Sequence, residues 1–166
     1  MKIYLVRHAI AENPETSGYE DDSLRPLTDK GREKMKKIAG ALKDIGVNPD
    51  LIVSSPYVRA SQTASILAKE LKYKEEIAYS DSLVPMGEPD DMIGEINEKY
   101  SVDKLMLVGH EPNLSMLMSV LLAGNPDISI NLKKGGVCCI SVDDLHYDRK
   151  AVLEWLVTPK ISTRIT

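Results

Sequence analysis

Three short apolar runs, separated by segments of helical periodicity, constrain the fold of this chain more than any other feature. The runs span residues 3–6, 51–53 and 105–108, are rich in branched side chains and end at polar or turn residues, as buried strands do. Over residues 35–45 and 60–71, apolar residues instead recur at three-to-four spacing, as on the buried face of a helix. This alternation predicts a three-layer α/β/α sandwich with a mainly parallel central sheet.

Capping residues set the expected ends of these helices. The first should begin after Thr28 and end near Gly46, and the helix that starts at Pro112 should be closed by Gly124. Two later apolar runs, residues 137–142 and 152–157, are separated by a polar turn. We expect them to form an antiparallel pair of strands that extends the sheet.

Length and composition indicate an ordinary globular protein. The 166 residues suit a single domain over residues 1–166, and 43% hydrophobic with 28% charged residues argues against disorder. A formal net charge of −4 gives no general attraction for nucleic acid or for an anionic membrane. Any anion must therefore be recognised by a local cluster of cations, and we expect a monomer with its chemistry in a pocket.

The sequence also predicts a cytoplasmic location. Cys138 and Cys139 are adjacent, so a disulfide between them would be strained, and we interpret both as reduced thiols with no metal or redox role. Residues 3–6 are too few for the core of a signal peptide. The apolar segment 114–123 falls short of the roughly 20 residues that cross a bilayer.

Reactive side chains follow each of the three predicted strands. Arg7 and His8 come after the first, Ser54–Pro56 and then Arg59 after the second, and residues 109–111, Gly-His-Glu, after the third. In an open α/β sheet the carboxyl ends of parallel strands share one edge, so these groups should meet there. Two arginines with planar guanidinium forks suit the several oxygens of a phosphoryl group. We therefore expect a phosphate-binding pocket.

Histidine is the best candidate for a nucleophile in this set. Neither cysteine lies in a motif, and Ser54 and Ser55 have no neighbouring general base in the sequence. A neutral imidazole is nucleophilic near pH 7, and transfer to its nitrogen divides hydrolysis into two displacements separated by a phosphohistidine. The second histidine can then donate to a nonbridging oxygen.

These motifs resemble those of the histidine phosphatase superfamily, and within it the SixA-type phosphohistidine phosphatases. The resemblance covers most of residues 2–124, in the family's order and spacing. It rests on the following blocks: residues 5–9, which match the Arg-His-Gly signature with Ala9 in place of glycine; residues 54–56, 59–60 and 62–64; residues 108–110; and the subgroup's Arg-Pro-Leu-Thr at 25–28, continued by Gly31.

The resemblance implies a phosphoglycerate mutase-like fold and a metal-independent phosphatase without an organic cofactor. By the same resemblance, His8 is the nucleophile and Arg7, Arg59 and His110 form the phosphate pocket. Arg25 is implied as a further contact for the substrate anion, although it can also pair with the acidic run 20–22. The expected substrate is a phosphohistidine on a protein.

Two other functions remain open. The first is a small-molecule phosphomonoesterase or mutase that uses the same His8 chemistry, and the second is an inactive module that binds phosphoproteins. Only about 30 residues, Tyr73 to Asp103, separate the second helix from the third strand, too few for a large capping insertion. An uncapped site favours a protein substrate over a small one.

The proton donor to the leaving group has two candidates. Glu111 directly follows His110, where the acid phosphatase branch carries its proton donor, and Glu88 lies in the region that supplies a glutamate in the phosphoglycerate mutase branch. We favour Glu111, because one peptide bond fixes it beside the pocket. Beside Pro112 it also suits the first turn of a helix. The acidic run 20–22 and His146 are expected to be solvated.

Overall fold

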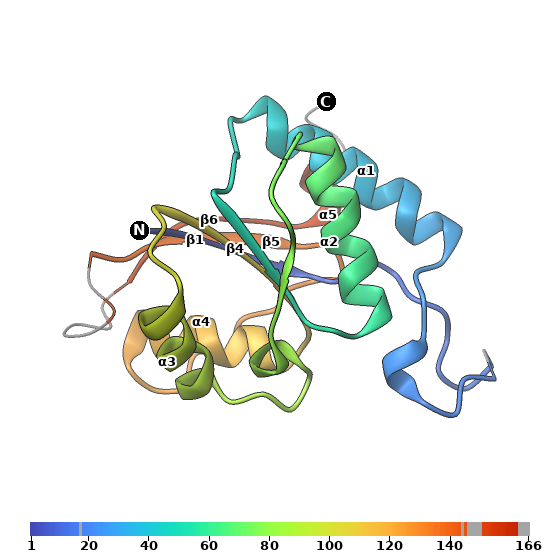
Figure 1. The fold of residues 1–166 in the computed structure, drawn as a ribbon. Coiled ribbons are helices and arrows are strands. Elements are labelled where there is room, and N and C mark those ends of the chain that lie inside the picture. Colours follow the sequence, from blue (N-terminus) through green and yellow to red (C-terminus); the bar gives the residue numbers. More distant parts are fainter. Residues whose placement is uncertain (17, 144, 146–150, 163–166) are drawn as a thin grey trace.

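The computed structural model describes residues 1–16, 18–143, 145 and 151–162, with no account of the side chains at 161 and 162. The described residues contain a central six-stranded sheet in the order β3-β2-β4-β1-β5-β6 (Figure 1). Its strands are β1 (Lys2–Arg7), β2 (Leu51–Ser54), β3 (Ala78–Tyr79), β4 (Lys104–Gly109), β5 (Val137–Ser141) and β6 (Val152–Val157).

The first four strands are parallel and the last two are not. β4 pairs in parallel with both β1 and β2, and β2 pairs in parallel with β3. β5 runs antiparallel to β1, and β6 antiparallel to β5. The mainly parallel sheet and the late antiparallel pair are both confirmed.

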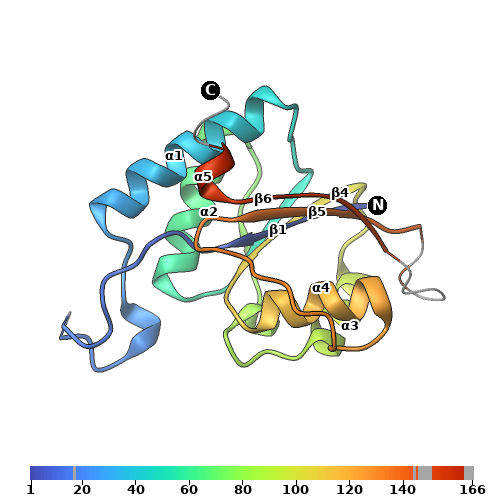
Figure 2. The ribbon, with the colours of Figure 1, turned by 180° about the vertical axis from the view of Figure 1, so that it is seen from behind.

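Helices cover the two faces of the sheet, as the front and back views show (Figures 1 and 2). One face carries α1, α2 and α5, and the other carries α3 and α4. The helices are α1 (Asp29–Asp44), α2 (Val58–Glu70), α3 (Pro89–Lys99), α4 (Asn113–Ala123) and α5 (Pro159–Ser162), with single 3₁₀ turns η1 (Asp22–Leu24) and η2 (Asp81–Leu83). The predicted α/β/α sandwich is confirmed.

Alternate residues of each strand enter one of two hydrophobic cores, because successive side chains in a strand point to opposite faces. In β1, Ile3 and Leu5 pack with α3 and α4, whereas Tyr4 and Val6 pack with α1 and α2. A strand covered on both faces needs an uninterrupted apolar run, which is the pattern in the sequence. Cys138 and Cys139, both free and buried, likewise belong to opposite cores.

The ends of the helices follow the capping signals in the sequence. Thr28 is the N-cap of α1, and its hydroxyl accepts a hydrogen bond from the Gly31 amide at 2.9 Å. Gly124 ends α4 in the left-handed conformation, at φ 75°, which glycine adopts without steric cost. α3 lies in the segment 73–103, for which the sequence predicted no element.

The carboxyl ends of β1, β2 and β4 lie together at one end of the molecule (Figure 1). Residues 9–16 leave β1 at this end, and η1 follows them before α1 begins. His146 lies outside the described residues. None of the helices formed by the described residues combines the length and the apolarity that crossing a bilayer requires.

Candidate active site

The register of the sheet brings the three predicted motifs to the same level. Val108 of β4 is paired with Val6 of β1 on one side and with Ser54 of β2 on the other. The residues that follow are therefore neighbours: the His8 amide donates to the Gly109 carbonyl at 3.0 Å, and the Ser55 amide donates to the Val108 carbonyl at 2.9 Å. Main-chain hydrogen bonds thus hold all three motifs in place.

His8 is buried at the end of β1, with 5% of its surface exposed. Its Nδ1 lies 2.7 Å from the Ala9 carbonyl oxygen, which can only accept a hydrogen bond, so Nδ1 carries the proton and Nε2 keeps its lone pair. Burial, reinforced by the positive charges of Arg59 and Arg7, lowers the pKa of His8 to about 3. The ring is therefore neutral and nucleophilic at pH 7.

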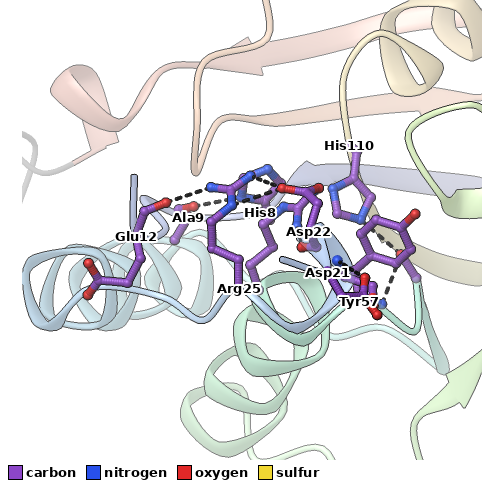
Figure 3. Close-up of polar contacts among 11 residues, drawn as sticks. His8, Ala9, Glu12, Asp21, Asp22, Arg25, Tyr57 and His110 are labelled. Carbon is purple, nitrogen blue, oxygen red and sulfur yellow. Dashed lines mark hydrogen bonds and ion pairs between the residues drawn. The ribbon is translucent and has the colours of Figure 1, made fainter. Parts of the chain in front are cut away.

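His110 is buried beside His8, and the two ring centroids are 5.0 Å apart. Its Nε2 lies 2.9 Å from the Ser55 hydroxyl, while its buried Nδ1 has no partner among the described residues. Tyr57 packs edge-on against the His110 ring at 5.1 Å (Figure 3). Burial and the neighbouring His8 and Arg59 lower the pKa of His110 to about 2, so this ring is also neutral.

Arg7 and Arg59 each leave one buried nitrogen without a partner. Nη1 of Arg7 donates to the Leu132 carbonyl at 2.8 Å, and the terminal nitrogens of Arg59 donate to Asp22, but Nε of both arginines is unpaired within the described part of the chain. Desolvation lowers the pKa of both guanidinium groups. An anion bound between them would offset this cost of burying positive charge.

Three buried nitrogens near His8 have no partner among the described residues: Nε of Arg7, Nε of Arg59 and Nδ1 of His110. Buried polar atoms are normally hydrogen-bonded, so an unpaired set in one place indicates a ligand that completes it. Two of the three belong to cationic guanidinium groups, and the His8 ring beside them is neutral. This arrangement fits the nonbridging oxygens of a phosphoryl group.

Arg25 contacts its own loop in this structure. Its Nε and Nη2 donate to Asp22 Oδ1 at 3.0 and 2.8 Å, and Nη1 donates to the Glu12 carbonyl at 2.7 Å (Figure 3). Asp22 Oδ2 in turn accepts a hydrogen bond from Arg59 Nη2 at 2.8 Å. One carboxylate of the acidic run thus joins both arginines, so the run is not simply solvated as the sequence predicted.

Glu111 and Glu88 differ in their surroundings. Glu111 is half-buried: Oε2 accepts a hydrogen bond from the Ser115 hydroxyl, and Oε1 is buried with no partner among the described residues. Burial raises the pKa of Glu111, although Ser115 and the charge of Arg7 oppose the shift. Glu88 is exposed at the N-cap of α3. Of the two, Glu111 has the surroundings of a proton donor near the pocket.

The structure adds a cation that the sequence analysis missed. Lys134 lies in a turn whose Gly135 amide donates to the carbonyls of Arg7 and His8, at 3.0 and 3.1 Å. Its side chain is exposed, and partial desolvation together with Arg7 lowers its pKa. Only the neighbouring glycine pair hints at this turn in the sequence.

No group of three or more His, Cys, Asp or Glu side chains within the described ranges could hold a metal ion.

Comparison with known proteins agrees with this geometry. Residues 3–86 match the family model of the histidine phosphatase superfamily (branch 1). The chain is 35% identical over 140 residues to an uncharacterised protein of a Picosynechococcus species, covering 82% of each chain. It is 25% identical over 126 residues to the phosphohistidine phosphatase SixA of Escherichia coli, covering 75% of this chain and 76% of SixA.

A solved structure extends the comparison to the fold. The protein histidine phosphatase SixA complexed with tungstate superposes with a TM-score of 0.80 at 22% identity, covering 97% of this chain and 99% of the other. The fold is that of the phosphoglycerate mutase-like histidine phosphatases. The chain belongs to the histidine phosphatase superfamily (branch 1).

Proposed function

We propose that the protein hydrolyses phosphohistidine on a protein substrate, through a covalent phosphohistidine on Nε2 of His8. The observation that carries the proposal is the set of three buried nitrogens, unpaired among the described residues, close to a histidine whose Nε2 keeps its lone pair. In the first step this lone pair attacks phosphorus, and the bond between phosphorus and the leaving nitrogen breaks. In the second step water attacks, the bond to His8 breaks and inorganic phosphate leaves.

Electrostatics supports each step. Arg7 and Arg59 hold positive charge where the phosphoryl oxygens gain negative charge, and His110 donates without adding a charge of its own. Donors that are already in place and partly dehydrated stabilise a transition state without reorganising. For Arg25 to contact the substrate, it must break its hydrogen bonds with Asp22 and form new ones with the incoming anion.

Glu111 is the proposed proton donor. Its raised pKa keeps a proton available at higher pH than an ordinary glutamate would, and Arg7 lies within electrostatic range. Glu111 gives this proton to the leaving group in the first step and takes one from the attacking water in the second. Its hydrogen bond with Ser115, in the first turn of α4, also gives Glu111 a structural role.

The choice of substrate rests on two observations. SixA of E. coli, a phosphohistidine phosphatase, is similar over three quarters of both chains. The segment between α2 and β4 holds only β3, η2 and α3, none of which forms a large insertion of the kind that caps a small-molecule site. Both favour a protein substrate over a sugar phosphate.

Substrate preference tests this proposal. We expect kcat/KM for a phosphohistidine-bearing protein to exceed the values for sugar and aryl phosphates. A marked preference for the small esters would assign the site to a phosphomonoesterase, and phosphoprotein binding without turnover would assign it to an inactive module.

Covalent labelling tests the nucleophile separately. Rapid quenching during turnover of a ³²P-labelled substrate should yield an acid-labile, alkali-stable protein adduct that disappears in His8→Ala. An adduct that persists in this variant would move the nucleophile to another residue.

A further inference from the structure

Ser55 lies directly behind His110, out of reach of solvent. Ser55 is the first residue after β2, and 0% of its surface is exposed. Its hydroxyl oxygen is 2.9 Å from His110 Nε2. The same oxygen accepts a hydrogen bond from the Tyr57 amide at 3.3 Å. The hydroxyl thus has two neighbours, one of which can only donate.

This environment decides where the hydroxyl proton points. The hydroxyl carries one proton, and His110 Nε2 is the acceptor that the described residues offer it. If Nε2 carried a proton instead, two donors would face the oxygen and the buried hydroxyl proton would have no acceptor. With the proton on Nε2, the hydroxyl proton and the Nδ1 lone pair would both be buried without a partner, whereas with the proton on Nδ1 only the Nδ1–H lacks one among the described residues. Each unpaired buried group costs about 1–3 kcal/mol. The hydroxyl therefore donates to Nε2.

A neutral imidazole with an acceptor at Nε2 must carry its proton on Nδ1. That nitrogen is buried and has no partner in the described part of the chain, so its N–H is left for a ligand to accept. His8 has the same tautomer, imposed by the Ala9 carbonyl, and its Nε2 keeps a lone pair. The two rings, 5.0 Å apart, thus present one lone pair and one N–H.

We propose that Ser55 is a positioning residue that fixes the Nδ1–H tautomer of His110, so that this histidine donates a hydrogen bond to the phosphoryl group. Without the hydroxyl, the proton is free to occupy Nε2, and the Nδ1 lone pair would then face the anion. Tyr57 packs edge-on against the ring and holds its orientation while the tautomer is set. The identity of the anion rests on the proposed function, whereas the tautomer does not.

Long-range ¹H–¹⁵N correlation spectra of the free protein test the tautomer directly. The chain has three histidines, so His8→Asn and His146→Asn assign the signals by elimination. At pH 7 we expect the His110 Nδ1 of the wild type to show the shift of a protonated ring nitrogen and Nε2 that of an unprotonated one. In Ser55→Ala the proton should move toward Nε2, and Ser55→Thr, which keeps the hydroxyl, should restore the wild-type pattern.

Ser54→Ala is the matched control. Ser54 is the preceding residue and equally buried, but its hydroxyl donates to the Ser55 carbonyl at 2.9 Å rather than to a histidine. We expect Ser54→Ala to leave the His110 tautomer unchanged. Dispersed amide spectra would establish that each variant is folded.

Kinetics provide the second readout. Ser55→Ala should lower kcat/KM by about tenfold to a hundredfold, less than outright loss of a donor to developing negative charge, and should raise the inhibition constant of inorganic phosphate. A wild-type His110 protonated on Nε2, or a Ser55→Ala spectrum identical to the wild type, would overturn the proposal. The predicted tautomers in a protein that turns over no phosphorylated substrate would instead count against the proposed function alone.

Discussion

Glu111 has features of both a proton donor and a structural carboxylate. Its carboxyl group is partly dehydrated, with a raised pKa and one buried oxygen unpaired in the described structure, yet it also binds Ser115 at the start of α4. A proton donor matters most when the departing oxygen is basic, where it contributes typically 10²–10⁴-fold. A structural carboxylate would matter equally for every substrate.

Glu111→Gln should therefore slow alkyl phosphates by about a hundredfold or more, and change p-nitrophenyl phosphate by less than about fivefold. A phosphohistidine should fall between, because imidazole leaves readily once it is protonated. The measurement is kcat/KM across leaving groups of graded basicity, with Glu88→Gln, the variant of the rival candidate, measured alongside. Equal small losses on all substrates, together with a lower Tm, would assign Glu111 to the helix start and direct the search to Glu88.

At the scale of elements, the start of α1 determines how the chain leaves His8. The Thr28 amide donates to the Ile10 carbonyl at 3.0 Å, so the helix begins against the segment that follows the nucleophile. A Cβ added at Gly31 would lie 2.1 Å from this carbonyl oxygen, whereas one added at Gly40, in the same helix, would meet nothing within 4 Å. The two glycines form a matched pair.

Gly31→Ala should destabilise the protein by about 1–3 kcal/mol, because backbone must move to admit the methyl group, and should also lower activity. Gly40→Ala should stabilise it by about 0.5–1 kcal/mol through the helix preference of alanine alone. Urea unfolding of both variants measures the difference. Similar stabilisation in the two variants would show that the backbone of residues 9–11 moves without a free-energy cost. It would contradict the expectation that the start of α1 positions His8.

The elements show what the sequence could and could not predict. β1, β2, β4, α1 and α4 were predictable, because two-sided burial and capping leave local signals. α3 was missed although Met92, Ile93 and Ile96 have helical spacing, since charged residues surround them. β3 has two residues and forms by pairing with β2, so no local sequence pattern predicts it.

The candidate site divides in the same way. His8 and His110 could be proposed because each directly follows a predictable strand. The pairing of Asp22 with Arg59 and of Ser55 with His110 joins residues 37 and 55 positions apart, and depends on loop conformation and strand register. Such contacts are properties of the tertiary structure, and nothing in the local sequence specifies them.

For the molecule as a whole, two buried neutral histidines make folding sensitive to mild acid. In the unfolded chain each histidine has a pKa near 6.5. In the folded protein, burial lowers the pKa to about 3 for His8 and about 2 for His110. Between these limits the unfolded state holds more protons, so stability is complete above pH 6.5 and falls as the pH is lowered toward 3.

Each histidine should remove about 1.4 kcal/mol of unfolding free energy between pH 7.5 and 5.5, or about 2.7 kcal/mol together. This is a sizeable fraction of the 5–15 kcal/mol typical of folded proteins. Asp22, whose pKa is held below its usual value by Arg25 and Arg59 despite partial burial, loses its contribution only at lower pH, as it becomes protonated. Glu111, whose pKa burial raises, opposes the histidines as the pH falls, because the folded state binds its proton before the unfolded chain does. The histidine contribution is therefore measured as a difference between the wild type and a histidine variant.

Urea unfolding at pH 7.5, 6.5 and 5.5 measures this dependence, and His8→Gln is the informative variant because glutamine does not titrate. Its loss of unfolding free energy over this range should be smaller than the wild-type loss by about 1.4 kcal/mol, whatever its stability at pH 7.5. Saturating inorganic phosphate should stabilise the wild type at each pH, since it binds only the folded state. A wild-type free energy that stays constant from pH 7.5 to 5.5 would mean that both rings titrate as freely as in the unfolded chain, which is incompatible with two neutral histidines facing a dehydrated phosphate pocket.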